Sequence, residues 1–229
     1  KNSNIKSIVL QINSPGGSAV ASEEIANAVK KTNKTTVAWI REVGASGGYW
    51  VASASDHIIA SRISLTGSIG VIGSYLEFPG LLKKYNVTYQ RLVSGEYKDI
   101  GSPFKEMTQD ERAIFQKYLD DIRDFFVEEV AKNRNLNKKE VEKIANGLVY
   151  LGAEAKELGL VDELGSKDEV VDFIEKKEGI KAELVEYKKK TTLFDVLSEV
   201  MSQQSFFVGK GIGSAFLDKR ISSDIEITT

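Results

Sequence analysis

A single serine among glycines is the first group in this sequence whose type and setting suit catalysis. Ser46 lies in GASGG (residues 44–48), where a hydrophobic segment gives way to a helical pattern. Gly-x-Ser-x-Gly is typical of a nucleophile elbow, in which glycines allow a sharp strand-to-helix turn that exposes the serine hydroxyl. The same glycines also suit close packing of a helix on a sheet. Ser46 is therefore a candidate nucleophile that needs a base.

The histidine and cysteine content restricts the chemistry around Ser46. The sequence has no cysteine and one histidine, His57, which excludes a thiolate nucleophile and any site with two imidazole ligands. His57 follows Ser46 closely, on an expected strand, whereas an α/β-hydrolase has its histidine far downstream. We interpret His57 as a structural residue, and we expect no metal and no cofactor.

The remaining base for a serine is a lysine that loses its proton near neutral pH. Burial must lower the pKa of such a lysine by roughly 2 to 3 units from about 10.4. Lys98 stands alone in SGEYKDIGSP (94–103), in a loop that we expect to leave the sheet after a strand. Lys105 and Lys34 compete with it, and the pattern alone leaves the choice open.

Two further glycine motifs have backbone amides or hydroxyls to offer. NSPGG (13–17) carries the signature of a type II turn directly after the first expected strand. Such a turn can bring a backbone N–H against a substrate carbonyl. TGSIG (66–70) offers Ser68 as a hydroxyl that orients a lysine amine. Both motifs are also compatible with simple turns.

The elements that must position these groups alternate between strands and helices. Strands are expected at residues 7–13, 35–40, 57–61 and 87–93. Helices are expected at residues 21–29, from Ser46, from Thr108 to about 130, after Asn137, and near 152–158, 167–177 and 192–203. Thr108 and Glu111 form a capping-box signature. The alternation predicts an α/β fold, a parallel sheet covered by helices, with a helical C-terminal part.

Length and composition set the outer limits. A chain of 229 residues fits one domain, which we expect over residues 1–204, with a C-terminal tail over 205–229. A net charge of -2 and 41% hydrophobic residues indicate a soluble globular protein without a basic face for nucleic acid. No run approaches the roughly 18 to 20 apolar residues of a membrane span. Because a strand follows Lys1 almost at once, we expect that N-terminal strands and any membrane anchor are missing.

Five motifs, in this order, resemble the signal peptide peptidase A family. They are INSPGG (12–17), GASGGYW (44–50), LTGSIGVIG (65–73), SGEYKDIGSPFKEMT (94–108) and VDELG (161–165). The resemblance implies a Clp-protease/crotonase-like fold of repeated ββα units. It also implies a membrane-associated serine endopeptidase that hydrolyses hydrophobic peptides, chiefly remnant signal peptides, and that assembles into a homo-oligomeric ring. The catalytic domain would then lie on the extracytoplasmic side of the cell membrane, and this chain would be a soluble fragment.

The resemblance also assigns roles to individual residues. It implies that Ser46 is the nucleophile, that Lys98 is the general base and that Ser68 holds the lysine. The amides of Gly17 and Gly47 would form the oxyanion hole. The family's transmembrane helix ahead of the catalytic domain is absent from this sequence, so membrane association is expected through a segment outside the chain.

Other functions remain open on the sequence. One alternative is a crotonase-like acyl-CoA enzyme, which would use similar amides with a carboxylate as acid and base. Others are a Clp-like membrane-associated protease with other substrates and a catalytically silent scaffold. Residues 205–217 are apolar and rich in small residues, like the peptides such an enzyme cleaves. They suggest the hypothesis that the tail lies in an active-site groove of its own chain or of a neighbour.

Overall fold

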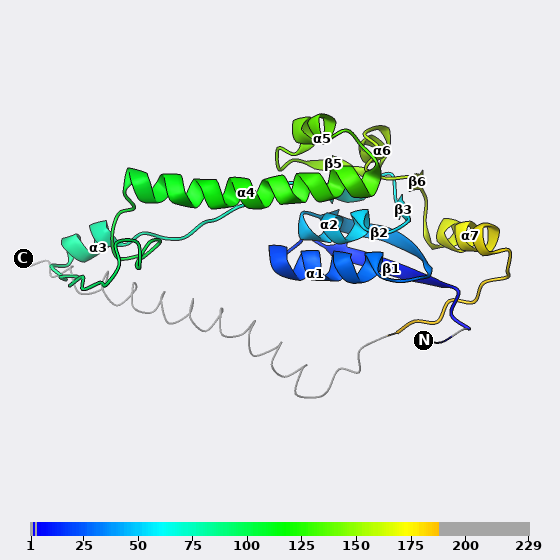
Figure 1. Cartoon of the computed structure of the whole chain (residues 1–229), viewed down its shortest axis with the longest axis horizontal. Coiled ribbons are helices and arrows are strands. Elements are labelled where there is room, and N and C mark those ends of the chain that lie inside the picture. Colours follow the sequence, from blue (N-terminus) through cyan, green and yellow to red (C-terminus); the bar gives the residue numbers. More distant parts are fainter. Residues whose placement is uncertain (1, 3, 188–229) are drawn as a thin grey trace, which may run out of the picture. The chain divides into compact units, whose positions relative to one another are not determined.

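A largely parallel sheet with one antiparallel strand forms the centre of the folded core (Figure 1). The computed structural model describes residue 2 and residues 4–187. The strands of this part are β1 (Ser7–Ser14), β2 (Thr35–Ala45), β3 (His57–Ala60), β4 (Leu65–Gly67), β5 (Val149–Leu151) and β6 (Glu163–Leu164). β2 pairs in parallel with β1 along most of its length, with β3 at Val37–Ile40 and with β4 at Val43–Ala45. β6 extends the sheet from β3, and β5 pairs antiparallel with β4.

The helices begin largely where the sequence signals predict. They are α1 (Ala19–Lys30), α2 (Gly47–Ser53), α3 (Pro79–Lys84), α4 (Gln109–Arg134), α5 (Lys138–Ile144), α6 (Gly152–Glu157) and α7 (Lys167–Glu178). The capping box of Thr108 and Glu111 at the start of α4 is confirmed. Asn137 caps α5 by accepting a hydrogen bond from the N–H of Lys139.

The core lies on both faces of β2 because successive side chains of a strand point to opposite faces. Ala38 and Ile40 belong to the larger cluster, which α1, α2 and the C-terminal half of α4 complete. Val37 belongs to a second cluster with residues of α7. In the larger cluster the ring of Trp50 stacks on Phe126 with their centroids 4.6 Å apart. The sequence-based α/β class is therefore confirmed, and the architecture is consistent with the Clp-protease/crotonase-like fold.

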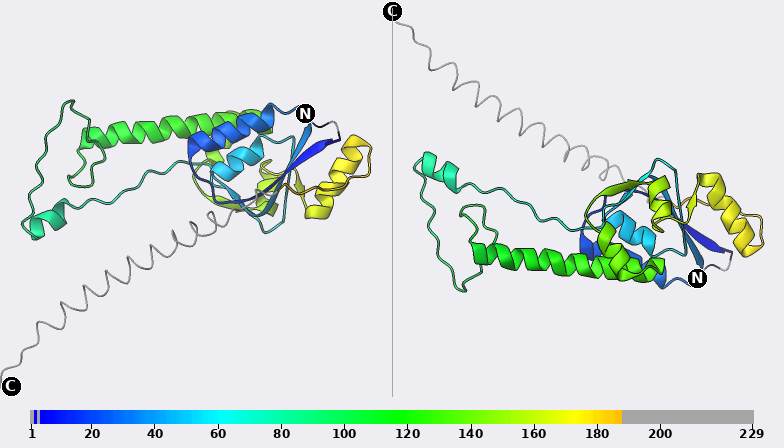
Figure 2. Two further views of the ribbon diagram at one scale, coloured as in Figure 1. Left: turned by 90° about the horizontal axis from the view of Figure 1, so that it is seen from below. Right: turned by 90° about the horizontal axis from the view of Figure 1, so that it is seen from above.

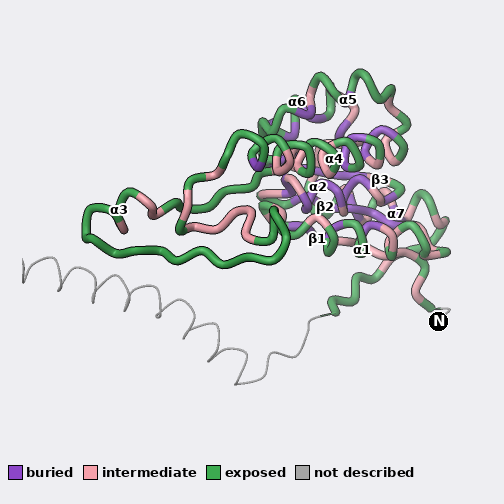
Figure 3. Tube along the Cα trace, turned by 60° about the vertical axis from the view of Figure 1, so that its left-hand side comes forward, coloured by how far each residue is buried: buried purple, intermediate pink, exposed green. Residues whose placement is uncertain are grey.

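Residues 74–108, which we call the arm, leave this core with the N-terminal half of α4. The arm follows β4, runs away from the core and includes α3. It then turns back into the N-terminal end of α4, which is the end of that helix away from α2 (Figures 1 and 2). Buried residues gather around β2 and α2, whereas the arm is exposed or partly buried (Figure 3). Within the arm, Phe78 N–H donates to the carbonyl of Pro103 over 2.7 Å. The arm is thus a structured segment with little core of its own.

The strand predicted at residues 87–93 is wrong. These residues form no regular element and all of them are exposed. Their β-branched and aromatic residues have high strand propensity, but such propensity measures packing on a half-buried sheet, and the arm offers no neighbouring strand.

Contacts divide the chain into residues 1–182 and 183–229. The domain boundary predicted at residue 204, the helix at 192–203 and the tail segment 205–217 lie outside the described residues and stay predictions. Among the helices that the structure describes, none is both long enough and apolar enough to cross a bilayer.

Candidate active site

Ser46 lies at a sharp turn between β2 and α2. It has φ 51° and ψ -124°, a left-handed conformation that is costly for a residue with a side chain. Its N–H donates to the carbonyl of Gly67 over 2.8 Å, and its own carbonyl accepts from the N–H of Trp50 over 2.9 Å. The turn is therefore fixed by backbone hydrogen bonds on both sides, and it has the strained strand-to-helix geometry of a nucleophile elbow.

Three strands bring their carboxyl ends to this turn. Ala45, the last residue of β2, pairs with Gly67, the last residue of β4. On β1, Ser14 pairs with Gly44. Because the strands are parallel, the segments that follow them emerge at one edge of the sheet, where ligands of open α/β sheets bind. Ser46, Ser68 and the turn at Gly16 and Gly17 are thereby brought together.

An irregularity between β1 and β2 positions the glycine turn. The register shifts between the pairs Ile12 with Ile40 and Ser14 with Gly44. At the shift the Val43 N–H donates to Asn13 Oδ1 over 3.1 Å. Our sequence analysis did not single out Asn13 as a positioning residue, although an Asn before a Pro-Gly-Gly turn is a recognised turn signal.

Ser14 holds the glycine turn from within. The N–H of Gly16 donates to Ser14 Oγ over 3.1 Å, which fixes the turn against its own strand end. Sequence reasoning missed this role too, because a serine directly after a strand has many possible partners.

Close contacts require glycine at Gly47 and at Gly16, on the two facing turns, whereas a Cβ on Gly17 would meet no atom within 4 Å. A Cβ added to Gly47 would lie 2.3 Å from Ser22 Oγ and 3.3 Å from the amide nitrogen of Gly17. A Cβ on Gly16 would lie 2.8 Å from the amide nitrogen of Gly47. Gly47 is the first residue of α2, so its N–H has no acceptor within the helix. Gly17 is exposed. The geometry suits two amide donors that converge on one substrate oxygen.

Ser68 follows β4 directly and is half-buried beside Ser46. Its N–H donates to the carbonyl of Leu148 over 2.8 Å, and its hydroxyl donates to the carbonyl of Gly147 over 3.1 Å. The hydroxyl oxygen keeps lone pairs that can accept a hydrogen bond from an amine.

Lys98 is exposed and lies on the arm, whose loops are distant from α2 (Figures 1 and 2). Within one chain the structure therefore does not bring Lys98 to Ser46.

The two competing lysines are committed elsewhere. Lys105 forms ion pairs with Glu111 and, at 3.9 Å, with Asp99. Lys34 donates to the backbone carbonyls of Asn2 and Ile5. It precedes the first residue of β2, so the 11-residue strand of about 36 Å separates it from Ser46. Neither is placed to act as the base.

His57 has a packing role away from Ser46. Its ring stacks on Phe173 with the centroids 3.9 Å apart, and its Nε2 lies 3.4 Å from a carboxylate oxygen of Glu163. It pairs with Val37 in the first half of β2, whereas Ser46 follows the last residue of that strand. A histidine-based triad with Ser46 is therefore excluded by position.

A family model and several relatives named as proteases match this chain. Residues 28–181 match the model of peptidase family S49. The chain is 35% identical to "Putative protease" of Methanocaldococcus jannaschii over 99% of its own length and 74% of that relative. It is 38% identical to "Putative signal peptide peptidase SppA" of Enterococcus faecium, covering 83% of the chain and 56% of the relative. It is also 38% identical to "Protease 4" of Haemophilus influenzae, over 75% of the chain but only 28% of that longer protein.

Proposed function

The chain belongs to peptidase family S49 and is a peptidase, and from this premise we propose that it is a serine endopeptidase with Ser46 as nucleophile and Lys98 as general base. The observation that carries the proposal is the strained turn at Ser46, with the amides of Gly17 and Gly47 beside it. A nucleophile needs an accessible hydroxyl and donors placed for the developing oxyanion; Ser46 is only half-buried, and the two amides lie beside it.

The proposed reaction has two stages, acylation of Ser46 and hydrolysis of the acyl-enzyme. The neutral amine of Lys98 removes the proton from Ser46 Oγ as the oxygen attacks the peptide carbonyl, and the amides of Gly17 and Gly47 bind the oxyanion. The lysine ammonium then gives its proton to the leaving amine, which leaves an acyl ester on Ser46. Water, deprotonated by the same lysine, hydrolyses the ester and restores both groups.

Lys98 reaches Ser46 from another copy of the chain. It is exposed on the arm, whereas a lysine base must be buried enough to lose its proton near neutral pH. Docking of the arm against a neighbouring copy would supply the burial that a lysine base requires. The arm carries large exposed apolar side chains that suit such an interface, among them Leu76, Leu81, Val87 and Leu92. A closed homo-oligomer with head-to-tail contacts gives every copy one donated lysine.

The substrates are hydrophobic peptides, and we propose remnant signal peptides as the main class. Leu148 and Val149 are 61% and 49% exposed. The carbonyl of Leu148 accepts the N–H of Ser68, and Val149 pairs with Gly67, whose carbonyl accepts the N–H of the proposed nucleophile Ser46. Exposed apolar side chains at this edge suit an extended apolar peptide. Membrane association through a segment outside this chain would bring the enzyme to such peptides. A polyacidic peptide turned over as fast as an alanine- and leucine-rich one would contradict this substrate class.

Substitution of the two proposed catalytic residues tests the function. Ser46→Ala and Lys98→Ala should each lower kcat/KM by about 10⁴-fold or more, because nucleophile and base act as one unit. The double variant should be no worse than either single variant. Lys83→Ala, which removes an exposed lysine from the same arm, is the matched control and should keep its activity.

Labelling separates this proposal from the crotonase-like alternative. A fluorophosphonate should modify Ser46, located by mass spectrometry of the digested protein. An acyl-CoA enzyme that uses a carboxylate would leave Ser46 unmodified and would keep its activity in Ser46→Ala.

A further inference from the structure

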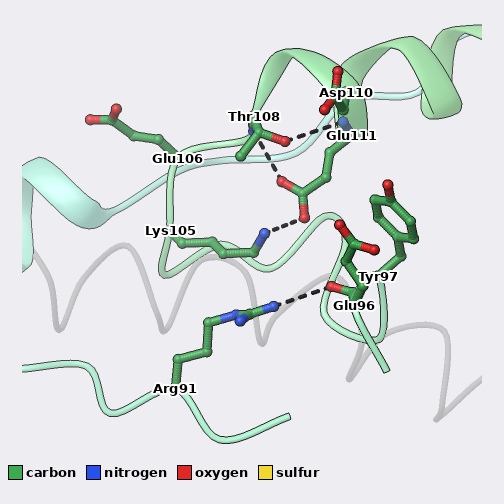
Figure 4. Close-up of a pocket in the computed structure, with 8 residues that line it drawn as sticks. All are labelled: Arg91, Glu96, Tyr97, Lys105, Glu106, Thr108, Asp110 and Glu111. Carbon is green, nitrogen blue, oxygen red and sulfur yellow. Dashed lines mark hydrogen bonds and ion pairs between the residues drawn. The ribbon is translucent and has the colours of Figure 1, made fainter. Parts of the chain in front are cut away.

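The residue that follows Lys98 is the centre of an ion-pair network in the arm. Asp99 is held by Arg91 through two parallel hydrogen bonds, Nε to Oδ2 at 2.6 Å and Nη2 to Oδ1 at 2.8 Å. Two parallel bonds of this kind fix orientation as well as distance. Arg91 Nη2 also donates to the carbonyl of Glu96 at 3.3 Å, so the arginine binds the turn before and after Lys98 (Figure 4).

A second cation ties this turn to the start of α4. Lys105 pairs directly with Glu111 (Figure 4). Its Nζ also lies 3.9 Å from Asp99 Oδ1. Glu111 is only 4% exposed, and its other oxygen accepts the N–H of Thr108 over 3.0 Å in the capping box. The network therefore runs from Arg91 through Asp99 and Lys105 to the first turn of a long helix.

The network contrasts with Lys98 itself. The side chains of Asp99 and Lys105 are 13% and 19% exposed, whereas Lys98 is exposed. Hydrogen bonds from Arg91 lower the pKa of Asp99, and the hydrogen bond from Lys105 lowers the pKa of Glu111, so both carboxylates are ionised at neutral pH. The side chain next to the proposed base is thus fixed while the base remains free to point outward.

The turn is also constrained by its backbone. The N–H of Lys98 donates to the carbonyl of Gly95 over 3.2 Å, and the N–H of Ser102 donates to the carbonyl of Asp99 over 2.9 Å. Gly101 has φ 77°, and a Cβ there would lie 3.2 Å from the ring of Phe115 on α4. Asp99 is the residue of this turn whose side chain attaches it to Arg91 and Lys105.

We propose that Asp99 is a positioning residue for the peptidase reaction, which fixes the turn so that Lys98 is presented outward to the nucleophile. The inference rests on the proposed function, in which Lys98 is the base. Asp99 acts through Lys98 and does not touch the substrate. A displacement of about 1 Å in a reacting group can cost about 100-fold in rate, so attachment of this turn matters for kcat more than for substrate binding.

The test is Asp99→Asn in the full chain, with Glu96→Gln as the matched control. Both variants remove one carboxylate from the same turn, but Glu96 forms no ion pair with Arg91 or Lys105. Asp99→Asn should lower kcat about 10- to 100-fold with KM changed less than about threefold. Glu96→Gln should stay within about twofold of the parent. Arg91→Lys keeps the positive charge but loses the paired hydrogen bonds to Asp99, so it should lower kcat by an intermediate factor. It is a second test of the same attachment if Asp99→Asn does not fold.

The pH profile separates positioning from a simple charge effect. Because Asp99→Asn leaves Arg91 and Lys105 uncompensated, any shift of the midpoint of the kcat profile should be to lower pH, and a positioning role predicts that the loss of kcat persists on the high-pH plateau. A midpoint that moves to lower pH with kcat preserved would mean that Asp99 acts only through its charge. Unchanged kcat in Asp99→Asn, with Lys98→Ala inactive, would overturn the positioning role and leave the proposed function standing. Full activity in Lys98→Ala would overturn the proposed function itself.

Discussion

The two halves of the proposed site are built in different ways. At the sheet edge, Ser46, Gly17 and Gly47 are placed by strand register and backbone hydrogen bonds, and Gly16 and Gly47 are packed too closely for a Cβ. In the arm, the turn that carries Lys98 is attached by side-chain ion pairs and has little buried surface. The proposed nucleophile and oxyanion donors are therefore preorganised within one chain, whereas the position of the proposed base depends on side-chain ion pairs.

The difference suggests a division of labour. A rigid half keeps the oxyanion donors aligned, which is where electrostatic preorganisation contributes most to catalysis. Because the proposed base lies on the arm, the site remains incomplete until the arm of a second copy docks beside Ser46. Such a peptidase would be inactive as a free chain, because Lys98 lies on the arm, away from Ser46 of the same chain (Figures 1 and 2).

The largest expected effect on stability separates the buried and exposed faces of α4. Phe126 is 2% exposed and stacks on Trp50, so Phe126→Ala should lower the free energy of unfolding by about 3 to 5 kcal/mol. Its neighbour Phe125 is 62% exposed, and Phe125→Ala should change it by less than about 0.5 kcal/mol. Urea unfolding of both variants measures the contrast. Equal losses would mean that the outer face of α4 is covered in solution by another copy.

A methyl group added at the nucleophile turn should show how tightly the sheet edge is packed. Gly47→Ala puts a Cβ 2.3 Å from Ser22 Oγ and should lower kcat/KM about 100-fold by displacing an oxyanion donor. Adding Ser22→Ala removes that oxygen, and the nearest atoms then lie 3.3 Å away, so activity should return in part. Gly80→Ala has no atom within 4 Å of the added Cβ and serves as the control. No recovery in the double variant would show that the clash is not the cause.

Lowering the pH should destabilise the arm before it destabilises the sheet edge. Asp99 and Glu111 have lowered pKa values in the folded chain, so their stabilising contribution is complete above the ordinary carboxyl pKa of about 4. It is lost as the pH falls through the lower folded values. Hydrogen exchange, corrected for the intrinsic rate at each pH, should show severalfold less protection in residues 94–106 at pH 3 than at pH 6. Equal loss of protection in β2 would mean that the arm is not the weaker attachment.

The core half of the site was largely predictable because its signals are local. The glycines around Ser46 are required by close packing, and Gly16 after Pro15 also has a positive φ. The capping residues Thr108 and Asn137 mark helix starts. The adjacency of Ser46 and Ser68 was not readable from periodicity, because it depends on the pairing of β2 with β4. The roles of Asn13, Ser14 and Ser22 depend on register and close approach, which a sequence does not display.

The arm half was less predictable. The pattern at residues 87–93 has the composition of a strand, yet it forms none because it has no partner strand. Pattern alone left Lys98, Lys105 and Lys34 in competition. Lys105 is distinguished by its pairing with Glu111, and Lys34 by its place at the opposite end of β2. Both distinctions depend on the three-dimensional structure and cannot be read from the sequence pattern.

Complementation between two inactive variants tests most directly whether the site is shared between copies. Ser46→Ala and Lys98→Ala chains, co-expressed in equal amounts and purified as one assembly, are assayed on an alanine- and leucine-rich peptide. If each site joins Ser46 of one copy with Lys98 of its neighbour, random assembly should restore about a quarter of the parent activity, since half of the chains can supply each group. Activity no greater than the sum of the two separate variants would contradict the account, because it would mean that serine and lysine must belong to the same chain.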